Sequence, residues 1–208
     1  MKRNLLGQHF LKTRLPVSLM IKSAEEEEPV DFILEVGPGR GTLTRELSKN
    51  FKKIIAVEKD TYLAEELRDA LGKEGVGNCE IIAGDILKIN IAALAGKRTY
   101  AVIANIPYYL TSRLIRVFLE NTEKPRYMIL MVQKEVAERI TARPPDMNLL
   151  ALSVQAYGRP EIIGRVSRKE FQPEPEVDSA IVKISGISKR FFTEQSTSEK
   201  EFFAVIRA

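Results

Sequence analysis

The feature that most constrains the fold is an alternation between short apolar runs and helical patterns. Runs rich in β-branched residues occupy 31–36, 53–57, 79–82, 100–104 and 127–132. Helical patterns follow at 42–50, at about 60–71, after Thr111 or Ser112 as a cap, and at 134–141. Because the runs are apolar throughout, each predicts a strand that is buried on both faces. We therefore expect an α/β fold of the Rossmann-like kind, with helices on both faces of a mostly parallel sheet.

The pattern changes after Pro144. Residues 149–156 suit a helix, and 162–166 and 180–184 suit late antiparallel strands. Residues 200–207 begin an amphipathic helix that no cap or glycine ends.

Composition excludes several classes of protein. The apolar runs are too short to span a membrane, and the basic start of the chain lacks the apolar core of a secretion signal, so we expect a cytoplasmic protein. Cys79 is the single cysteine, which leaves no internal disulfide and no Cys-x-x-Cys half of a zinc site, and we expect no metal. The net charge of +4 favours a nucleic acid partner only weakly.

A glycine-rich turn follows the first apolar run. Gly37, Gly39 and Gly41 have the spacing G-x-G-x-G, whereas a dinucleotide fingerprint needs its third glycine at position 42, which is Thr42. Pro38 also removes a backbone donor from the turn. This pattern disfavours NAD.

Carboxylates stand at the ends of the next two predicted strands. Glu58 lies about 20 residues beyond the glycines, where a carboxylate accepts the hydroxyls of a ribose. Asp85 and Ile86 together suit an adenine, with its amino edge on the acid and its face on the apolar side chain. Each feature alone is weak, because such acids are often helix caps. At three successive strand ends they predict a nucleoside without phosphates, namely S-adenosyl-L-methionine.

The fourth predicted strand runs into the sequence "NIPYY", residues 105–109. By itself this motif is equally well a strand-ending turn with two half-buried tyrosines. Beside a cofactor site it indicates catalysis, with Asn105 and Tyr108 at the reacting base and Tyr109 as packing.

Five segments in order resemble the KsgA-type ribosomal RNA adenine N6-dimethyltransferase family, over nearly the whole chain. They are "GQHFL" at 7–11, "LEVGPGRGTLT" at 34–44, "NIPYYLTS" at 105–112, "MVQKEVAERITARP" at 131–144 and "FQPEPEVDSAIVKI" at 171–184. The resemblance implies a methyltransferase domain over 1–186, and over 187–208 a linker and the start of a C-terminal helical domain that looks truncated.

The resemblance also implies the site residues. The cofactor-binding residues would be His9, Leu11, Gly37, Gly39, Glu58, Asp85, Ile86 and Asn105. The catalytic residues would be Asn105, Ile106, Tyr108 and Phe171. Asn105 and the Ile106 carbonyl would accept the amino hydrogens of adenine, Pro107 would hold that carbonyl still, and Tyr108 and Phe171 would cover the two faces of the base.

The implied reaction is dimethylation of two adjacent adenosines in the 3'-terminal hairpin loop of small-subunit (16S) ribosomal RNA, by a monomer acting on a pre-30S particle during small-subunit biogenesis. One alternative is a macrolide-resistance enzyme that modifies large-subunit RNA, although the segment at 131–144 suits the small-subunit branch better. Another is a non-catalytic RNA-binding assembly factor, which would be expected to have lost the glycine turn or "NIPY". Ile106 disfavours a DNA amino-methyltransferase, whose motif has proline there.

Overall fold

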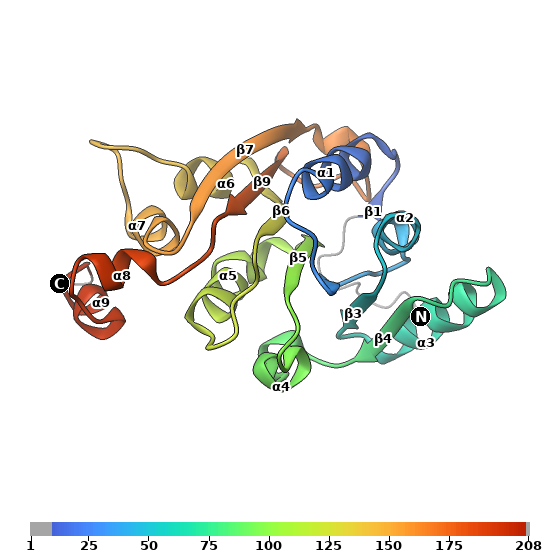
Figure 1. The fold of residues 1–208 in the computed structure, drawn as a ribbon. Coiled ribbons are helices and arrows are strands. Elements are labelled where there is room, and N and C mark those ends of the chain that lie inside the picture. Colours follow the sequence, from blue (N-terminus) through green and yellow to red (C-terminus); the bar gives the residue numbers. More distant parts are fainter. Residues whose placement is uncertain (1–9, 207–208) are drawn as a thin grey trace.

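A seven-stranded sheet forms the centre of the computed structural model, which describes residues 10–206 (Figure 1). Its strand order is β4-β3-β2-β5-β6-β9-β7. The parallel strands are β2 (Phe32–Val36), β3 (Ile54–Glu58), β4 (Cys79–Ala83), β5 (Tyr100–Asn105) and β6 (Met128–Gln133). The antiparallel strands are β9 (Ser179–Ser185) and β7 (Arg159–Val166). The predicted mixture of parallel and late antiparallel strands is confirmed.

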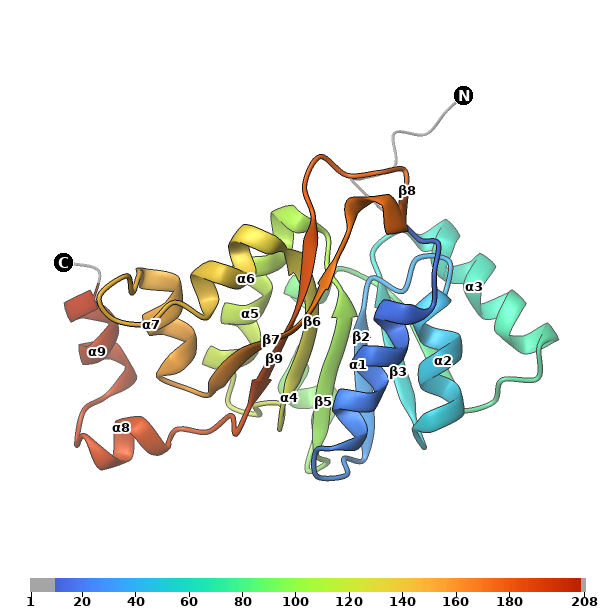
Figure 2. The same ribbon diagram turned by 90° about the horizontal axis from the view of Figure 1, so that it is seen from above.

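Helices cover both faces of the sheet, as Figure 2 shows from above. One face carries α1 (Leu15–Glu25), α2 (Thr42–Asn50) and α3 (Thr61–Lys73). The other carries α4 (Ile91–Ala95), α5 (Thr111–Glu120), α6 (Lys134–Ile140) and α7 (Leu149–Gln155). Alternate residues of β2 separate the two cores: Ile33 packs with α1 and α2, whereas Phe32 and Leu34 pack with α4 and α5. Every residue of β2 and β3 is buried, which is why these strands read as continuous apolar runs.

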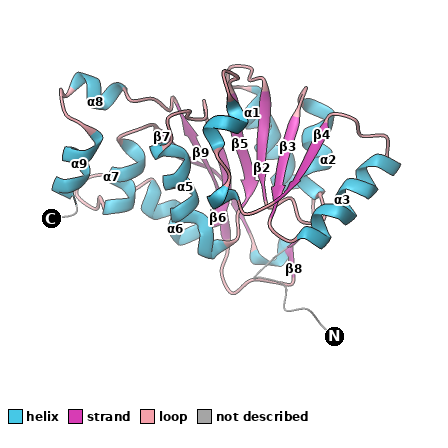
Figure 3. Cartoon of the chain, turned by 90° about the horizontal axis from the view of Figure 1, so that it is seen from below, coloured by secondary structure: helices cyan, strands magenta, loops and turns pink. Residues whose placement is uncertain are grey.

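A two-stranded ribbon lies outside the main sheet. It pairs β1 (Phe10–Leu11) with β8 (Phe171–Gln172) in antiparallel register, with Leu11 opposite Phe171. Figure 3 shows β8 beyond one end of the main sheet. The ribbon thereby joins the start of the described chain to the segment just before β9.

Two local expectations need correction. Neither Thr111 nor Ser112 caps α5, because the helix begins at Thr111 and its cap position, Leu110, makes no side-chain capping bond. The Thr111 hydroxyl is buried instead, without a partner among the described residues. Asp60 does cap α3, as predicted, and accepts hydrogen bonds from the backbone N–H groups of Tyr62 and Leu63.

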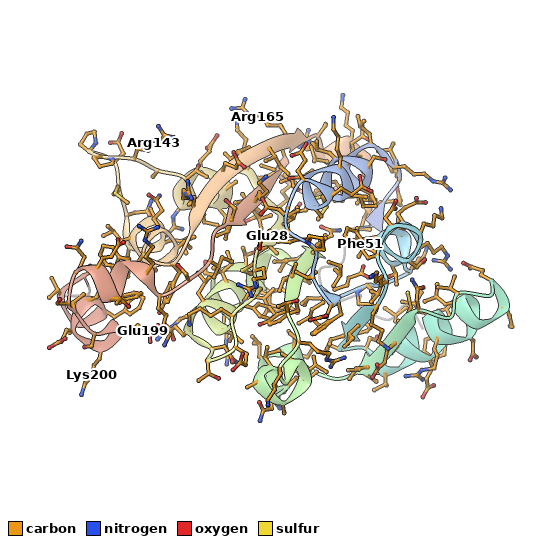
Figure 4. All side chains as sticks on the ribbon, viewed as in Figure 1. Glu28, Phe51, Arg143, Arg165, Glu199 and Lys200 are labelled. Atoms are coloured by element: carbon orange, nitrogen blue, oxygen red, sulfur yellow. The ribbon has the colours of Figure 1, made fainter. Side chains whose placement is uncertain are left out.

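The last helices pack onto the body of the fold. These are α8 (Arg190–Glu194) and α9 (Glu199–Ile206). Phe192 and Phe203 contact the ring of Tyr157 and belong to the same buried cluster as β5 and β6 side chains. Glu199 accepts a hydrogen bond from the Tyr157 hydroxyl at 3.0 Å, whereas Lys200 points away from the body (Figure 4). No helix within residues 10–206 has the length and apolar character needed to cross a membrane.

One carboxyl group lies inside the core. Glu35 of β2 is 1% exposed, and its Oε2 has no hydrogen-bond partner among the described residues. The pKa of Glu35 is raised to about 8, chiefly by burial; Thr44 opposes the shift and the charge of the neighbouring Glu58 adds to it. The folded protein therefore keeps Glu35 protonated at a pH where the unfolded chain has lost that proton.

This pKa difference predicts how stability changes with pH. Between pH 4.5, the ordinary pKa of a glutamate side chain, and about pH 8, the folded state binds more protons at Glu35, so the free energy of unfolding falls as pH rises. Glu35→Gln removes this dependence. One pKa unit represents about 1.4 kcal/mol. The free energy of unfolding of Glu35→Gln, measured with denaturant, should therefore rise relative to that of wild type by at least about 1 kcal/mol from pH 5 to pH 8.

The exposed Glu65 of α3 provides the control. Glu65→Gln is expected to follow the wild-type pH curve. Parallel curves for wild type and Glu35→Gln would contradict the prediction.

Candidate nucleoside and base site

The carboxyl ends of four parallel strands open onto one cleft of about 240 Å³. The glycine turn after β2 forms one wall, together with Glu58 from the end of β3. Residues 84–87, which follow β4, form another part of the lining. Residues 105–110, at and beyond the end of β5, complete it with Leu11 of β1. In an open parallel sheet, this edge is where ligands bind.

The glycine turn needs glycine for its backbone shape. Gly37, Gly39 and Gly41 have φ angles of 67°, 55° and 79°, in the region that other residues rarely adopt. A Cβ on Gly41 would also lie 2.3 Å from Cδ1 of Leu67 on α3. The turn therefore lies close against the neighbouring helix and leads directly into α2.

Glu58 holds two loops together. Its Oε2 accepts a hydrogen bond from the Gly39 N–H and its Oε1 accepts one from the Asp60 N–H, both at 3.0 Å. The residue is 2% exposed and still lines the cleft. Each carboxylate oxygen has a second lone-pair direction, so these bonds leave acceptor capacity for a ligand hydroxyl.

Asp85 lies at the tip of β4 and points its carboxylate at local donors. It accepts a hydrogen bond from the Leu87 N–H at 3.1 Å and lies 3.2 Å from Lys59 Nζ. Burial opposes ionisation, but the Leu87 and Lys59 interactions outweigh it and lower the pKa of Asp85. The carboxylate is therefore charged at neutral pH. Ile86, the next residue, is buried and lines the same cleft.

The "NIPYY" segment begins at the end of β5. Asn105 is the last strand residue and pairs with Met131, and the Ile106 N–H donates to the Met131 carbonyl at 3.2 Å. Pro107 then turns the chain into the short 3₁₀ helix η2 (Tyr108–Leu110). This arrangement holds the backbone of Asn105 and Ile106 against a central strand while both residues line the cleft.

The two tyrosines of the motif lie in different surroundings. Tyr108 is half-buried, and its hydroxyl shares a hydrogen bond of 2.9 Å with Oγ of Ser179. Tyr109 is 65% exposed and lines the cleft, so it does not serve as packing, which corrects the expectation from sequence.

The structure brings most of the predicted site residues together. Those lining the cleft are Leu11, Gly37, Gly39, Glu58, Asp85, Ile86, Asn105, Ile106 and Tyr108. His9 lies outside the described residues. Phe171 is not in the cleft: its ring is 1% exposed and packs in the cluster under α1, because β8 pairs with β1 and turns this side chain inward. The expectation that Phe171 covers the base is therefore not met.

Three residues in or next to the cleft were not predicted from the sequence. Glu35 lines the cleft floor, and its place directly before the glycine turn was the available signal. Arg113 lines the cleft one helical turn after Tyr109, a spacing that "YYLTSR" shows. Ser179 is distant in sequence, and only the folded chain shows its contact with Tyr108.

The lining fits the predicted cofactor. Glu58 and Asp85 contribute two carboxylates to one cleft, which suits a ligand with cationic groups and ribose hydroxyls, and the protonated Glu35 adds a neutral carboxyl group. Ile86 and Leu87 add an apolar surface for a flat ring. Oε2 of Glu35, which has no hydrogen-bond partner among residues 10–206, is a further polar group for a ligand to satisfy.

Comparisons with known proteins show which family the chain resembles. A family model described as ribosomal RNA adenine dimethylase matches residues 1–208. A relative from Dehalococcoides mccartyi, named ribosomal RNA small subunit methyltransferase A, is 44% identical over 204 residues, which cover 98% of this chain and 68% of the relative.

Two solved structures share the fold. A dimethyladenosine transferase from Plasmodium falciparum has a TM-score of 0.83 and 30% identity, covering 96% of this chain and 70% of that one. The 23S rRNA methyltransferase ErmE has a TM-score of 0.76 and 29% identity, covering 86% of this chain and 70% of that one. The chain described here belongs to the ribosomal RNA adenine dimethylase family.

Proposed function

We propose that this protein transfers methyl groups from S-adenosyl-L-methionine to N6 of adenine in small-subunit ribosomal RNA. The observation that carries the proposal is that Asn105 and Tyr108 line the same cleft as Gly37, Glu58 and Asp85. A nucleoside site and a site for a flat base with an amino edge therefore share one opening. The small-subunit relatives support the choice of RNA.

Residues at the ends of three strands would contact different parts of the cofactor. Glu58 would accept hydrogen bonds from the ribose hydroxyls, because its two backbone contacts leave lone pairs free on both oxygens. Asp85 would accept a hydrogen bond from the amino group of the cofactor adenine, and Ile86 would pack against the face of the adenine ring. Gly37, Gly39 and Leu11 would form the wall along the ligand, and His9 would join them from the N-terminal segment.

Catalysis in this site needs orientation rather than a strong base. When bound, the cofactor supplies a methyl group on a sulfonium sulfur, which is a good leaving group. The Asn105 side-chain oxygen and the Ile106 carbonyl would accept the two amino hydrogens, so that the nitrogen lone pair turns toward the methyl. During transfer, in which N6 would gain the methyl carbon and sulfur would lose it, both oxygens would stabilise the positive charge on N6, and one amino proton would then leave to solvent.

The same arrangement allows a second methyl group. N6-methyladenine keeps its nitrogen lone pair and one amino hydrogen, so one acceptor contact is given up and the other remains. We therefore expect two methyl groups on each base, at two adjacent adenosines of the 3'-terminal hairpin loop. Since small subunits assemble in the cytoplasm, we expect the protein to act there, as a monomer, on RNA in a pre-30S particle.

The likeness to ErmE keeps large-subunit RNA as the second candidate substrate, because that protein is named for 23S rRNA. The two candidates differ in which RNA acquires dimethyladenosine. Incubation with undermethylated small and large subunits, followed by primer extension and mass spectrometry of both RNAs, distinguishes them. Dimethyladenosine in the small-subunit RNA supports the proposal, and modification confined to large-subunit RNA would refute it.

The role of Asn105 gives the first prediction for this site. Asn105→Ala removes one of the two aligned acceptors, so methyl transfer is expected to fall by about 100-fold or more, as it does when an oxyanion-hole donor is removed. Cofactor affinity, measured by calorimetry, should change little. Asn50→Ala, at the exposed end of α2, is the matched control and should transfer methyl groups at the wild-type rate. Equal transfer by Asn105→Ala and wild type would overturn the assigned role.

The exposure of Tyr109 gives the second prediction for this site. Its exposed ring lines the cleft, as Arg113 does, so it can stack on the RNA base next to the target. Base–aromatic stacking contributes about 1–3 kcal/mol, so Tyr109→Ala should raise KM for the small subunit about tenfold, and Tyr109→Phe should not.

Tyr62 of α3 is the matched control for this test. It is 60% exposed and does not line the cleft, so Tyr62→Ala should leave KM unchanged. A KM for Tyr109→Ala equal to that of Tyr62→Ala would exclude Tyr109 from RNA binding.

A further inference from the structure

The hydroxyl of Tyr108 is held by a residue from a distant part of the chain. Ser179 is 0% exposed, and its Oγ lies 2.9 Å from the Tyr108 hydroxyl oxygen. A buried hydroxyl is costly unless it is hydrogen-bonded, so the tyrosine also satisfies the serine. The contact links the segment after β5 to the first residue of β9.

Ser179 stands on a rigid part of the sheet. It is paired on one side with Gln133 of β6 and on the other with Val166 of β7. The preceding residue, Asp178, is fixed as well: its carbonyl accepts a hydrogen bond from the Lys134 N–H at 3.0 Å, and its Oδ1 accepts one from the Arg168 N–H at 2.9 Å. The serine hydroxyl therefore has little freedom to move.

Tyr108, in contrast, begins a short segment that is only partly buried, although Leu110 at its end packs against the core. None of the three residues of η2 is buried, and Pro107 provides no side-chain cap. The hydrogen bond to Ser179 fixes the far end of the ring, while the backbone fixes the near end. These two attachments restrict how far the ring can swing. A ring restrained in this way loses less entropy when a base stacks on it.

The hydroxyl also keeps its proton. Burial raises the pKa of Tyr108, the Ser179 hydrogen bond opposes that shift, and the charge of Asp178 adds to it. A neutral phenol retains the hydrogen that the shared bond needs at the pH of the reaction.

We propose that Ser179 is a positioning residue of the methyl-transfer site, which acts through Tyr108 by presetting the ring that receives the target base. This inference rests on the proposed function, because it assigns Tyr108 to the base. Ser179 itself does not line the cleft. Its effect should therefore appear in the handling of RNA and not in the binding of the cofactor.

A double-mutant cycle tests the proposal with Ser179→Ala, Tyr108→Phe and the double variant. Each single variant removes one hydroxyl and keeps the rest of the side chain. Each should lower kcat/KM for undermethylated small subunits about fivefold, the effect of losing one neutral hydrogen bond. The double variant should be no worse than Tyr108→Phe, and the Kd of the cofactor should be unchanged in all three.

The cycle also separates positioning from a general role of Ser179 in folding. If Ser179→Ala lowers kcat/KM in the Tyr108→Phe background as much as in wild type, the serine does not act through Tyr108 and the proposal is overturned. Ser185→Ala, at the other end of β9, is the matched control and should leave kcat/KM unchanged. Wild-type activity of Ser179→Ala would overturn the proposal equally.

A second readout does not depend on methyl transfer. In protein labelled with ¹³C in its six tyrosine rings, the Tyr108 signal is identified by its loss in Tyr108→Phe. Ser179→Ala should shift or broaden this signal, and Ser185→Ala should not. An unchanged Tyr108 signal in Ser179→Ala would refute the proposal even if the protein methylated another RNA, whereas failure of wild type to methylate small subunits would refute only the proposed function.

Discussion

The site depends on the two hydrogen bonds that the Glu58 carboxylate accepts. The carboxylate accepts them from the N–H groups of Gly39 and Asp60, and so it joins the turn after β2 to the start of α3. A carboxylate at the end of a buried strand is costly to keep unless backbone donors surround it, and these two donors offset that cost. The geometry of the glycine turn and the chemistry of the proposed nucleoside site thus depend on the same two oxygens.

The sheet explains why residues so far apart in sequence meet. Parallel strands end at the same edge, so Glu58, Asp85 and Asn105 arrive at one cleft from three strands. The antiparallel strand β9 enters between β6 and β7 and brings Ser179 to that edge. The parallel half of the sheet thus supplies the groups that would bind cofactor and base, and the antiparallel half supplies a support for Tyr108.

The sequence was sufficient for the parts of the fold that follow local rules. The bounds of α2, the cap of α3 and the succession of strands were readable because burial on both faces leaves continuous apolar runs. Helix α1 was not predicted although Val17, Met20, Ile21 and Ala24 have helical spacing, because two of the usual start signals are absent: Arg14 at the cap position makes no capping bond and the first turn has no acid. Tertiary contacts account for the errors at the site. The rings of Phe171 and Tyr109 look equally suited to packing or to stacking in a sequence, but pairing of β8 with β1 buries the first, and the η2 turn exposes the second. Neither outcome depends on local propensity, so no single-sequence pattern contains it.

In the proposed function, one cleft at the carboxyl edge of the sheet holds the methyl donor against the base site. A crystal structure of the protein with S-adenosyl-L-methionine tests it most directly. We expect ribose hydroxyls within hydrogen-bond distance of Glu58, adenine beside Asp85 and Ile86, and the methyl group directed at Asn105. Density for the cofactor elsewhere, such as the cavity between α5 and α7, or with its methyl group turned away from Asn105, would contradict it.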